Sequence, residues 1–253
     1  MDIRLDGRVA LITGATGGIG SAIANEFFKS GATVVINGRS QEKIDALTDK
    51  LLTGGDKKDA ARIFGIAMDL SALDAAANLV QRSIDKYKKL DIVVNNAGLV
   101  EGRPVSLSDT EFVERVMLVN YEIPYQIMKN ALVGMRKARW GRIINITSMA
   151  GQTGDAALSV YASSKAALHA TSQSIAAEYG RYNITVNSIA PGVVETDAIK
   201  KMRDEYKQET KKLIPCHRFA KPSEVADLAT FLASERAAYI NGQQIAINGG
   251  LCR

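Results

Sequence analysis

The sequence contains little cysteine and little histidine, and this scarcity excludes several kinds of chemistry. Among 253 residues there are two cysteines, Cys216 and Cys252, and two histidines. The spacing of the cysteines fits neither a metal site nor a redox pair, so we expect no bound metal. A chain with so few thiols fits a reducing compartment, and we expect a cytoplasmic protein.

Long apolar runs are absent as well. No stretch of about 18 apolar residues occurs, so we expect no membrane-spanning helix. Residues 1–7 are polar and lead directly into a predicted strand. Without an apolar segment in that position, we expect no secretory signal.

Acidic side chains are fewer than basic ones. The chain has 27 Asp and Glu against 32 Lys and Arg, which gives a formal net charge of +5. Such a balance can indicate a nucleic-acid partner. The basic residues are scattered through the predicted helices, however, and form no dense tail. The pattern therefore favours a solvated basic surface and anionic small ligands, with no nucleic acid.

Short runs of apolar, β-branched residues alternate with amphipathic stretches along the chain. The runs are apolar almost throughout, which is typical of parallel strands covered on both faces. We expect strands at 8–13, 33–37, 63–68, 92–95, 142–146, 185–190 and 245–247. We expect helices at 21–30, 41–52, 73–87, 109–137, 161–179 and 223–233. This alternation predicts an α/β fold, with residues 1–253 forming a single-domain, Rossmann-type doubly wound parallel sheet of about seven strands with helices on both faces.

One long segment, 193–221, breaks the alternation. It is charged and carries no strand pattern. Insertions of this length in a compact domain are usually functional. We therefore expect a substrate lid there.

A glycine-rich stretch, TGATGGIG at 13–20, follows the first predicted strand and opens a helix. Glycine lets the backbone turn sharply and approach a pyrophosphate, while the helix N-terminus supplies N–H donors and partial positive charge. The glycine spacing is a variant of the common dinucleotide pattern, and an ordinary tight turn is the alternative. The strand–loop–helix context favours a cofactor site formed by Gly14, Thr16, Gly17, Gly18, Ile19 and Gly20.

This turn resembles the cofactor turn of the classical short-chain dehydrogenases/reductases. Four further motifs resemble that family in order and spacing: Asn95-Asn96-Ala97-Gly98, Asn120, Ser148 with Tyr161-x-x-x-Lys165, and Pro191-Gly192 with Thr196. The resemblance covers essentially the whole chain and implies a nicotinamide-dependent oxidoreductase. It also implies further cofactor contacts from Asp69, Leu70, Asn96, Ala97, Gly98, Pro191, Gly192, Val194 and Thr196.

Tyr161 and Lys165 lie four residues apart, so on a helix they share one face. A free tyrosine has a pKa near ~10, and a nearby ammonium would lower that pKa toward the working range of an acid or base. Tyr161 could then give a proton to the alkoxide that develops as a carbonyl accepts hydride, and Ser148 could hold the substrate oxygen. The resemblance implies that Lys165 also binds the nicotinamide ribose and that Asn120 holds a water connecting Lys165 to solvent. Each residue alone could be ordinary helix or loop surface; their joint order and spacing favour the catalytic interpretation.

The end of the second predicted strand bears on the choice of dinucleotide. An acidic residue there would bind both ribose hydroxyls and repel a 2′-phosphate. The chain instead has Asn37 and Arg39, and the first acid is Glu42. Arg39 can bind a phosphate, although a solvent-facing arginine is the alternative. The sequence therefore predicts NADP(H), with Asn37 and Arg39 among the cofactor contacts.

Several segments, among them 141–146, 184–187 and 239–242, look most like bacterial 3-oxoacyl-acyl-carrier-protein reductases. These enzymes reduce a β-keto thioester carried on an acidic protein. Arg136, Lys137 and Arg139 supply a basic cluster next to the catalytic strand that could steer such a carrier toward the lid. Two departures from the pattern are Tyr182, in the usual place of a basic docking residue, and His217, where glycine is common.

Other functions remain open from the sequence. A reductase of a small ketone, a sugar or another secondary alcohol is one, and a dinucleotide-sensing protein without catalysis is another. The resemblance also implies a homotetramer whose core is formed by 223–233 and 244–247.

Overall fold

The computed structural model describes residues 3–53, 57–200 and 203–251. Cys252 and residues 201–202 of the predicted lid lie outside these ranges. Seven parallel strands form one sheet in the order β3-β2-β1-β4-β5-β6-β7. Their bounds are β1 Val9–Ile12, β2 Thr33–Gly38, β3 Ile63–Ala67, β4 Ile92–Asn95, β5 Gly141–Ile146, β6 Ile184–Pro191 and β7 Gln244–Ile247.

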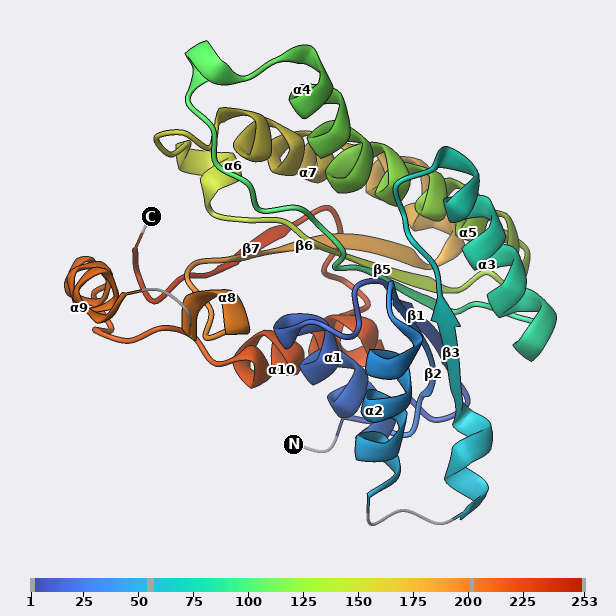
Figure 1. The fold of residues 1–253 in the computed structure, drawn as a ribbon. Helices are drawn as coiled ribbons and strands as arrows, with labels where there is room; N and C mark the ends of the chain where they lie inside the picture. The colour runs from blue at the N-terminus through green and yellow to red at the C-terminus, as the bar shows by residue number, and fades with distance from the viewer. Residues whose placement is uncertain (1–2, 54–56, 201–202, 252–253) are drawn as a thin grey trace.

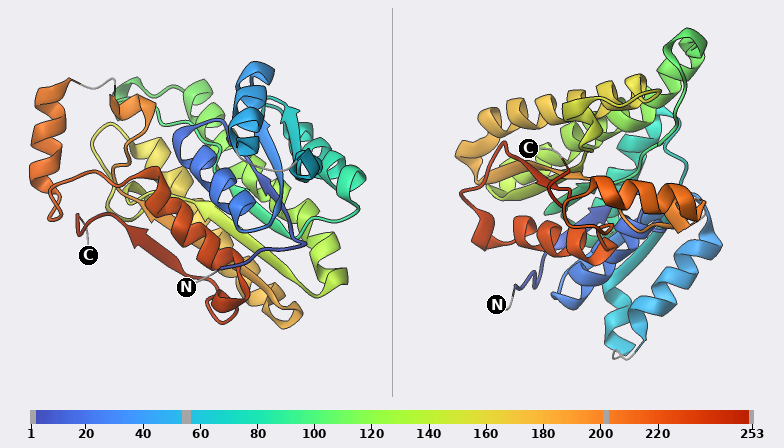
Figure 2. Two further views of the ribbon diagram at one scale, coloured as in Figure 1. Left: turned by 90° about the horizontal axis from the view of Figure 1, so that it is seen from below. Right: turned by 90° about the vertical axis from the view of Figure 1, so that its left-hand side faces the viewer.

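The apolar strands are buried because helices cover both faces of the sheet (Figures 1 and 2). One face carries α1 Gly18–Lys29, α2 Gln41–Leu52 and α10 Pro222–Ala233; the other carries α3 Leu73–Tyr87, α4 Thr110–Met117, α5 Ile123–Ala138 and α7 Ser159–Tyr179. Alternate residues of β1 enter different cores, Ala10 and Ile12 on the first face and Val9 and Leu11 on the second. The predicted doubly wound α/β fold is confirmed.

A helix occupies the predicted range 109–137, but it is not a regular α-helix throughout. The structure has α4 and α5, separated by one π-helical turn over Leu118–Glu122. Pro124 explains the break, because it has no N–H to donate to the carbonyl of Asn120 in a regular α-helix. The helix widens there, and single π turns of this kind are often found at functional sites.

The predicted lid contains two helices, α8 Asp197–Lys200 and α9 Asp204–Leu213. Its ends are joined by a parallel bridge between Val194 and Ala220. Ile214 and Phe219 are buried, while α9 projects from the edge of the molecule in Figure 1. The remaining elements are α6 Ala150–Thr153 and 3₁₀ turns at Lys57–Arg62, Val105–Leu107, Gly180–Tyr182 and Glu235–Ala237.

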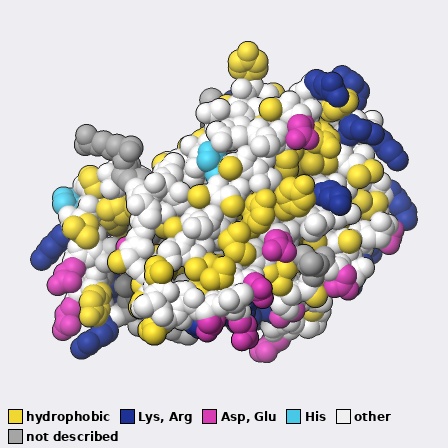
Figure 3. All heavy atoms as spheres, turned by 90° about the horizontal axis from the view of Figure 1, so that it is seen from above, with side chains coloured by type: hydrophobic (Ala, Val, Ile, Leu, Met, Phe, Trp, Pro, Cys, Tyr) yellow, Lys and Arg dark blue, Asp and Glu magenta, His cyan; other side chains and the backbone are white. Residues whose placement is uncertain are grey.

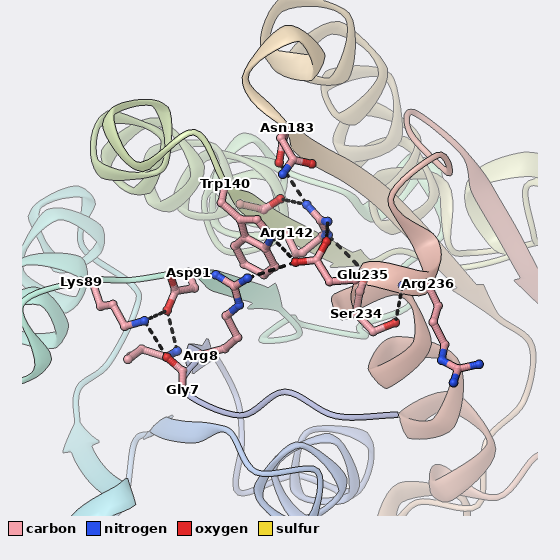
Figure 4. Close-up of polar contacts among 12 residues, drawn as sticks. Gly7, Arg8, Lys89, Asp91, Trp140, Arg142, Asn183, Ser234, Glu235 and Arg236 are labelled. Atoms are coloured by element: carbon pink, nitrogen blue, oxygen red, sulfur yellow. Dashed lines mark hydrogen bonds and ion pairs between the residues drawn. The ribbon is translucent and has the colours of Figure 1, made fainter. Parts of the chain in front are cut away.

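A cluster of charged side chains secures the amino ends of the central strands (Figure 4). Arg142 of β5 is fully buried and donates to the carbonyl oxygens of Gly141 at 2.9 Å and Asn183 at 3.0 Å. Its guanidinium lies 3.3 Å from a carboxylate oxygen of Glu235. That carboxylate also accepts from Trp140 Nε1 at 2.7 Å and from Arg8 at 3.0 Å. One glutamate therefore connects β1 and β5 with the segment after α10.

Glu235→Ala is expected to lower the free energy of unfolding by about 1–3 kcal/mol. Removing one partner of a buried ion pair usually costs about 3–5 kcal/mol, and the 63% exposure of the Glu235 side chain reduces that figure. Urea unfolding of the variant measures the change. Glu209→Ala, on the exposed surface of α9, is the control, and equal losses in the two variants would contradict the assignment.

Candidate active site

A cleft of about 540 Å³ opens at the carboxyl ends of β1, β2, β3 and β4. In open α/β sheets this is where ligands bind, beside the point at which the strand order reverses. It is lined by many of the residues that the sequence predicts to bind cofactor: Gly14, Thr16, Gly17, Gly18, Ile19, Gly20, Asn37, Arg39, Asp69, Leu70, Asn96, Ala97, Gly98 and Thr196. Lining residues that sequence reasoning missed include Lys43, Ser71, Leu99, Arg115 and Val119.

The glycine turn has the shape that a pyrophosphate requires. A Cβ atom at Gly20 would overlap the carbonyl oxygen of Gly14, so the turn closes only with glycine at that position. Helix α1 begins at Gly18, and its N-cap, Gly17, offers no side-chain acceptor. The N–H groups of the first turn are thus left for an anion. These residues fit the diphosphate of a dinucleotide.

The loop after β4 is joined rigidly to the glycine turn. Thr13 Oγ1 accepts hydrogen bonds from the backbone N–H groups of Asn96 and Ala97, both at 3.0 Å. Asn96 Nδ2 in turn donates to the carbonyl oxygens of Thr13 and Gly14, also at 3.0 Å. These hydrogen bonds hold the loops that follow β1 and β4 together where they line the cleft.

Basic side chains predominate where β2 ends. Arg39 is exposed and lines the cleft together with Lys43. Asn37 also lines it, but its side chain is buried and donates to the carbonyl oxygens of Ile66 and Met68 at 3.2 Å. Asn37 therefore joins β2 to β3, while the two basic residues offer charge to a ligand.

Ser148, Tyr161 and Lys165 come together beside this cleft. Tyr161 and Lys165 occupy successive turns of α7, and Ser148, which follows β5, lies close enough to the Tyr161 phenol to affect its pKa. Lys165 is buried, and its Nζ donates to the carbonyl oxygen of Ile146 at 2.9 Å. A Cβ atom at Gly98 would lie only 3.2 Å from Lys165 Nζ, so glycine there lets the lysine approach the end of β4.

Burial controls the protonation of this pair. It raises the pKa of the Tyr161 phenol, and the Ser148 side chain opposes that rise. Burial also lowers the pKa of Lys165 to about 8. In the protein without cofactor, burial therefore raises the pKa of Tyr161, whereas the expected lowering combines the Lys165 ammonium with the positive charge of a bound nicotinamide ring. The Lys165 ammonium donates to the carbonyl oxygen of Ile146 and lies 5.9 Å from the centre of the Tyr161 ring. The loss of hydration of the Tyr161 phenol therefore outweighs the effect of the ammonium on its pKa.

Asn120, in the π turn, connects the loop after β4 with α7. Its Oδ1 accepts from the N–H of Leu99 at 2.7 Å, and its Nδ2 donates to the carbonyl oxygen of Leu99 at 3.0 Å. The same Nδ2 donates to Ser164 Oγ at 3.1 Å, and Ser164 donates to the carbonyl oxygen of Tyr161. Sequence reasoning missed Ser164, although its position three residues after Tyr161 on a helix places it near the catalytic face.

The segment after β6 divides between two environments. Thr196 lines the cleft and approaches Gly18, where a Cβ atom would lie 2.9 Å from its methyl carbon. Val194 is buried and forms the bridge to Ala220. Pro191, Gly192 and Val194 are not among the residues that line the cleft.

The basic cluster lies next to the catalytic strand, as predicted, but at the end of that strand opposite to Ser148. Arg136 and Lys137 end α5, and Arg139 precedes β5, whereas Ser148 follows the opposite end of that strand. Arg139 donates to the carbonyl oxygen of Arg181 at 3.2 Å, at the amino ends of β5 and β6. Six residues of strand separate the two ends, which corresponds to roughly 20 Å.

Residues 3–53, 57–200 and 203–251 show neither a metal centre nor a membrane span. No three His, Cys, Asp or Glu side chains there are grouped in a way that could hold a metal ion. No helix among those residues has the length and apolar character to cross a membrane.

Comparison with known proteins identifies the family of the chain. Residues 14–252 match the family model described as enoyl-(acyl carrier protein) reductase. The chain is 38% identical to the 3-oxoacyl-acyl-carrier-protein reductase of Aquifex aeolicus over 99% of its length and 100% of that protein. It is 39% identical to nodulation protein G of Rhizobium sp., over 98% of each chain.

Solved structures with the same fold include two dehydrogenases. A putative gluconate dehydrogenase from Agrobacterium tumefaciens superposes with a TM-score of 0.92 at 28% identity, covering 99% of this chain and 98% of the other. A short-chain dehydrogenase/reductase from Brucella melitensis has a TM-score of 0.91 at 28% identity, with both chains fully covered. The chain therefore belongs to the short-chain dehydrogenase/reductase family of nicotinamide-dependent oxidoreductases.

Proposed function

We propose that this oxidoreductase uses NADP(H) to reduce a carbonyl to a secondary alcohol, and that its substrate is a 3-oxoacyl thioester. The observation that carries the proposal is the grouping of Ser148, Tyr161 and Lys165 beside a basic cleft with a glycine turn. The reductase of Aquifex aeolicus and its relatives support the choice of substrate.

The side chains divide the chemistry among them. The nicotinamide cofactor, when bound, supplies the hydride. Ser148 holds the carbonyl oxygen of the substrate, and Tyr161 gives its proton to that oxygen as negative charge develops. Lys165 binds the nicotinamide ribose, and Asn120 holds a water through which protons return to Lys165. Pro191, Gly192 and Val194 complete the nicotinamide end of the cofactor site.

NADP(H) is favoured over NAD(H) by the charge of the cleft. Arg39 and Lys43 line it at the end of β2, where an acidic residue would select NAD(H). We place the 2′-phosphate against Arg39.

Arg39→Ala is expected to raise the KM for NADPH at least about tenfold, while the KM for NADH changes little. A hydrogen bond to a charged group contributes roughly 1.5–3 kcal/mol, and only NADPH carries the phosphate that makes it. Steady-state kinetics with both cofactors measures the difference. A wild-type protein that prefers NADH would overturn the assignment of the dinucleotide.

The substrate proposal is tested by NADPH consumption with β-keto thioesters, simple ketones and keto-sugars. The proposal expects the thioesters to have the highest kcat/KM. A preference for keto-sugars or simple ketones would instead favour a small-carbonyl reductase, the second candidate, which the fold shared with a putative gluconate dehydrogenase supports. NADPH binding without turnover of any class would indicate a dinucleotide sensor.

We also propose that the thioester arrives on an acidic acyl carrier protein. Arg139 lies roughly 20 Å along β5 from Ser148 of the same chain, and we place the docked carrier there. The test compares one β-ketoacyl group on carrier protein and on a short thiol, at low and high salt. Arg139→Glu should remove the low-salt advantage of the carrier and spare the short thioester. Equal salt responses for the two substrates would exclude docking.

A cytoplasmic homotetramer is the assembly that we propose. Strand β7 is an edge of the sheet, and such an edge is commonly covered by another chain. A band of hydrophobic side chains also crosses the face shown in Figure 3, and the exposed apolar residues of α4 and α5 are Val113, Tyr125 and Val133.

Light scattering is expected to give the mass of four chains of 27.2 kDa each. We place α10 and β7 at the core of the tetramer, and burial of the β7 edge is the physical reason for expecting association. A stable species with the mass of one chain would contradict the prediction.

A further inference from the structure

Arg115 reaches the cofactor cleft from an element that has no predicted role in cofactor binding. It lies on α4, which covers the face of the sheet opposite to α2 (Figure 1). Lys43 belongs to α2, and Arg39 lies two residues before that helix begins. Arg115 and Val119, about one turn apart, both line the cleft together with Leu99. The cleft is thus bordered by basic side chains from both layers of helices.

The guanidinium of Arg115 is held at this border. Its Nη2 lies 2.9 Å from Glu101 Oε2, and its central carbon lies 5.8 Å from the centre of the buried Phe112 ring. Glu101 also lies 3.6 Å from Arg103, whose backbone N–H donates to the carbonyl oxygen of Ala157 at 2.7 Å. The loop that carries Glu101 is therefore anchored to the segment before α7, and Glu101 is a fixed partner for Arg115.

Stability does not account for this arrangement. The side chains of Arg115 and Glu101 are 43% and 40% exposed, and ion pairs at that exposure contribute about 0–1 kcal/mol. Loss of the pair should also leave the fold intact, so variants at both positions can be compared as folded proteins.

The cleft that Arg115 borders has a lining that suits a flat aromatic base. Leu70, Leu99 and Val119 offer apolar surface, while Asp69 is exposed and offers carboxylate oxygens to an amino group. A guanidinium is planar and stacks on aromatic faces. Adenine, a flat purine with an exocyclic amino group, matches these groups.

We propose that Arg115 is a cofactor-binding residue that stacks on the adenine base, and that Glu101 is the residue that positions it. The proposal rests on the dinucleotide function above. The two arginines then bind different parts of the cofactor. Arg39 binds the 2′-phosphate, whereas Arg115 binds the base and contributes equally to the affinity for cofactors with and without that phosphate.

Calorimetry with ADP-ribose and 2′-phospho-ADP-ribose tests the proposal, because both ligands contain adenine and lack nicotinamide. Arg115→Ala is expected to weaken both ligands by the same factor, roughly 3–30-fold, which is the range for a cation stacked on an aromatic ring. Arg39→Ala should weaken only the phosphorylated ligand. Arg82→Ala, which removes one exposed arginine from α3, should change neither.

Two further variants separate stacking from charge. Arg115→Lys keeps the charge without the planar group and should recover less than half of the lost binding free energy. Glu101→Ala should weaken both ligands about 2–5-fold, and it should add nothing to Arg115→Ala in the double variant. Circular dichroism confirms folding, with Arg115→Gln as the replacement if Arg115→Ala does not fold.

Several results would overturn the inference. These are unchanged ADP-ribose affinity in Arg115→Ala, a loss confined to the phosphorylated ligand, full recovery by Arg115→Lys, or additive losses in the double variant. Failure of the dinucleotide function on which the proposal rests gives a different result, because the wild-type protein would then bind neither ADP-ribose nor 2′-phospho-ADP-ribose.

Discussion

Tyr161→Phe is expected to lower turnover at least about 100-fold while leaving the fold and cofactor affinity largely unchanged. The phenylalanine ring fills the same buried space but has no proton to give to the substrate oxygen. Acid–base catalysis by a positioned group usually contributes about 100-fold or more. The measurement is kcat for the best carbonyl substrate, with NADPH affinity and circular dichroism recorded on the same preparation.

The matched control is Tyr179→Phe, at the far end of the same helix. It removes an identical hydroxyl group from a position remote from Ser148, and its turnover should remain near that of the wild type. Near-normal turnover of Tyr161→Phe would falsify the assignment of the proton donor. A comparable loss in both variants would mean that the helix, rather than the phenol, was damaged.

Lys165→Met is expected to abolish most turnover and, in the absence of cofactor, to stabilise the protein at pH 7. Burial lowers the pKa of Lys165 from 10.5 to about 8, which corresponds to a penalty of about 3 kcal/mol for keeping the charged form in the folded state. Methionine removes that penalty but leaves the carbonyl of Ile146 without its donor, at a cost of about 1 kcal/mol. The expected net gain is about 2 kcal/mol.

The sign of the pH dependence follows from the same pKa. Between pH 8 and about pH 10.5 the unfolded lysine is protonated and the folded one is not, so the stability of the wild type rises with pH in that window. The difference in the free energy of unfolding between Lys165→Met and the wild type should therefore be largest at pH 7 and should shrink toward pH 10. Urea unfolding of both proteins at the two pH values, at one protein concentration, measures this. A variant less stable than the wild type at pH 7 would contradict the prediction.

Much of the fold could be predicted because its signals are local in the sequence. The apolar runs identify all seven strands, and the glycine turn identifies the start of α1. The π turn at Leu118–Glu122 is one irregular turn inside a long helical pattern, and that pattern alone does not indicate it. Pro124, two residues past the break, was the available signal.

Site residues could likewise be predicted where the signal is local in the sequence, and not where the packing of distant segments brings them together. Residues within one motif, such as Tyr161 and Lys165, are placed together by helix geometry alone. Arg115 joins the cleft only through the packing of α4 above the sheet, and no spacing in the sequence indicates it. Arg139 shows the opposite error: it is near the catalytic strand in sequence, yet the direction of β5 carries Ser148 to the other end of the sheet.

The π turn also determines which changes in length this protein can accept. A single π turn corresponds to one residue inserted into an α-helix, and each residue of a helix turns the chain by about 100°. Deleting one residue from Leu118–Glu122 would restore a regular helix and rotate α4 by that angle relative to α5. Phe112 and Val116 would leave the core, and Arg115 would turn away from the cleft. This helix should therefore accept many substitutions on its exposed face but no deletion across the turn.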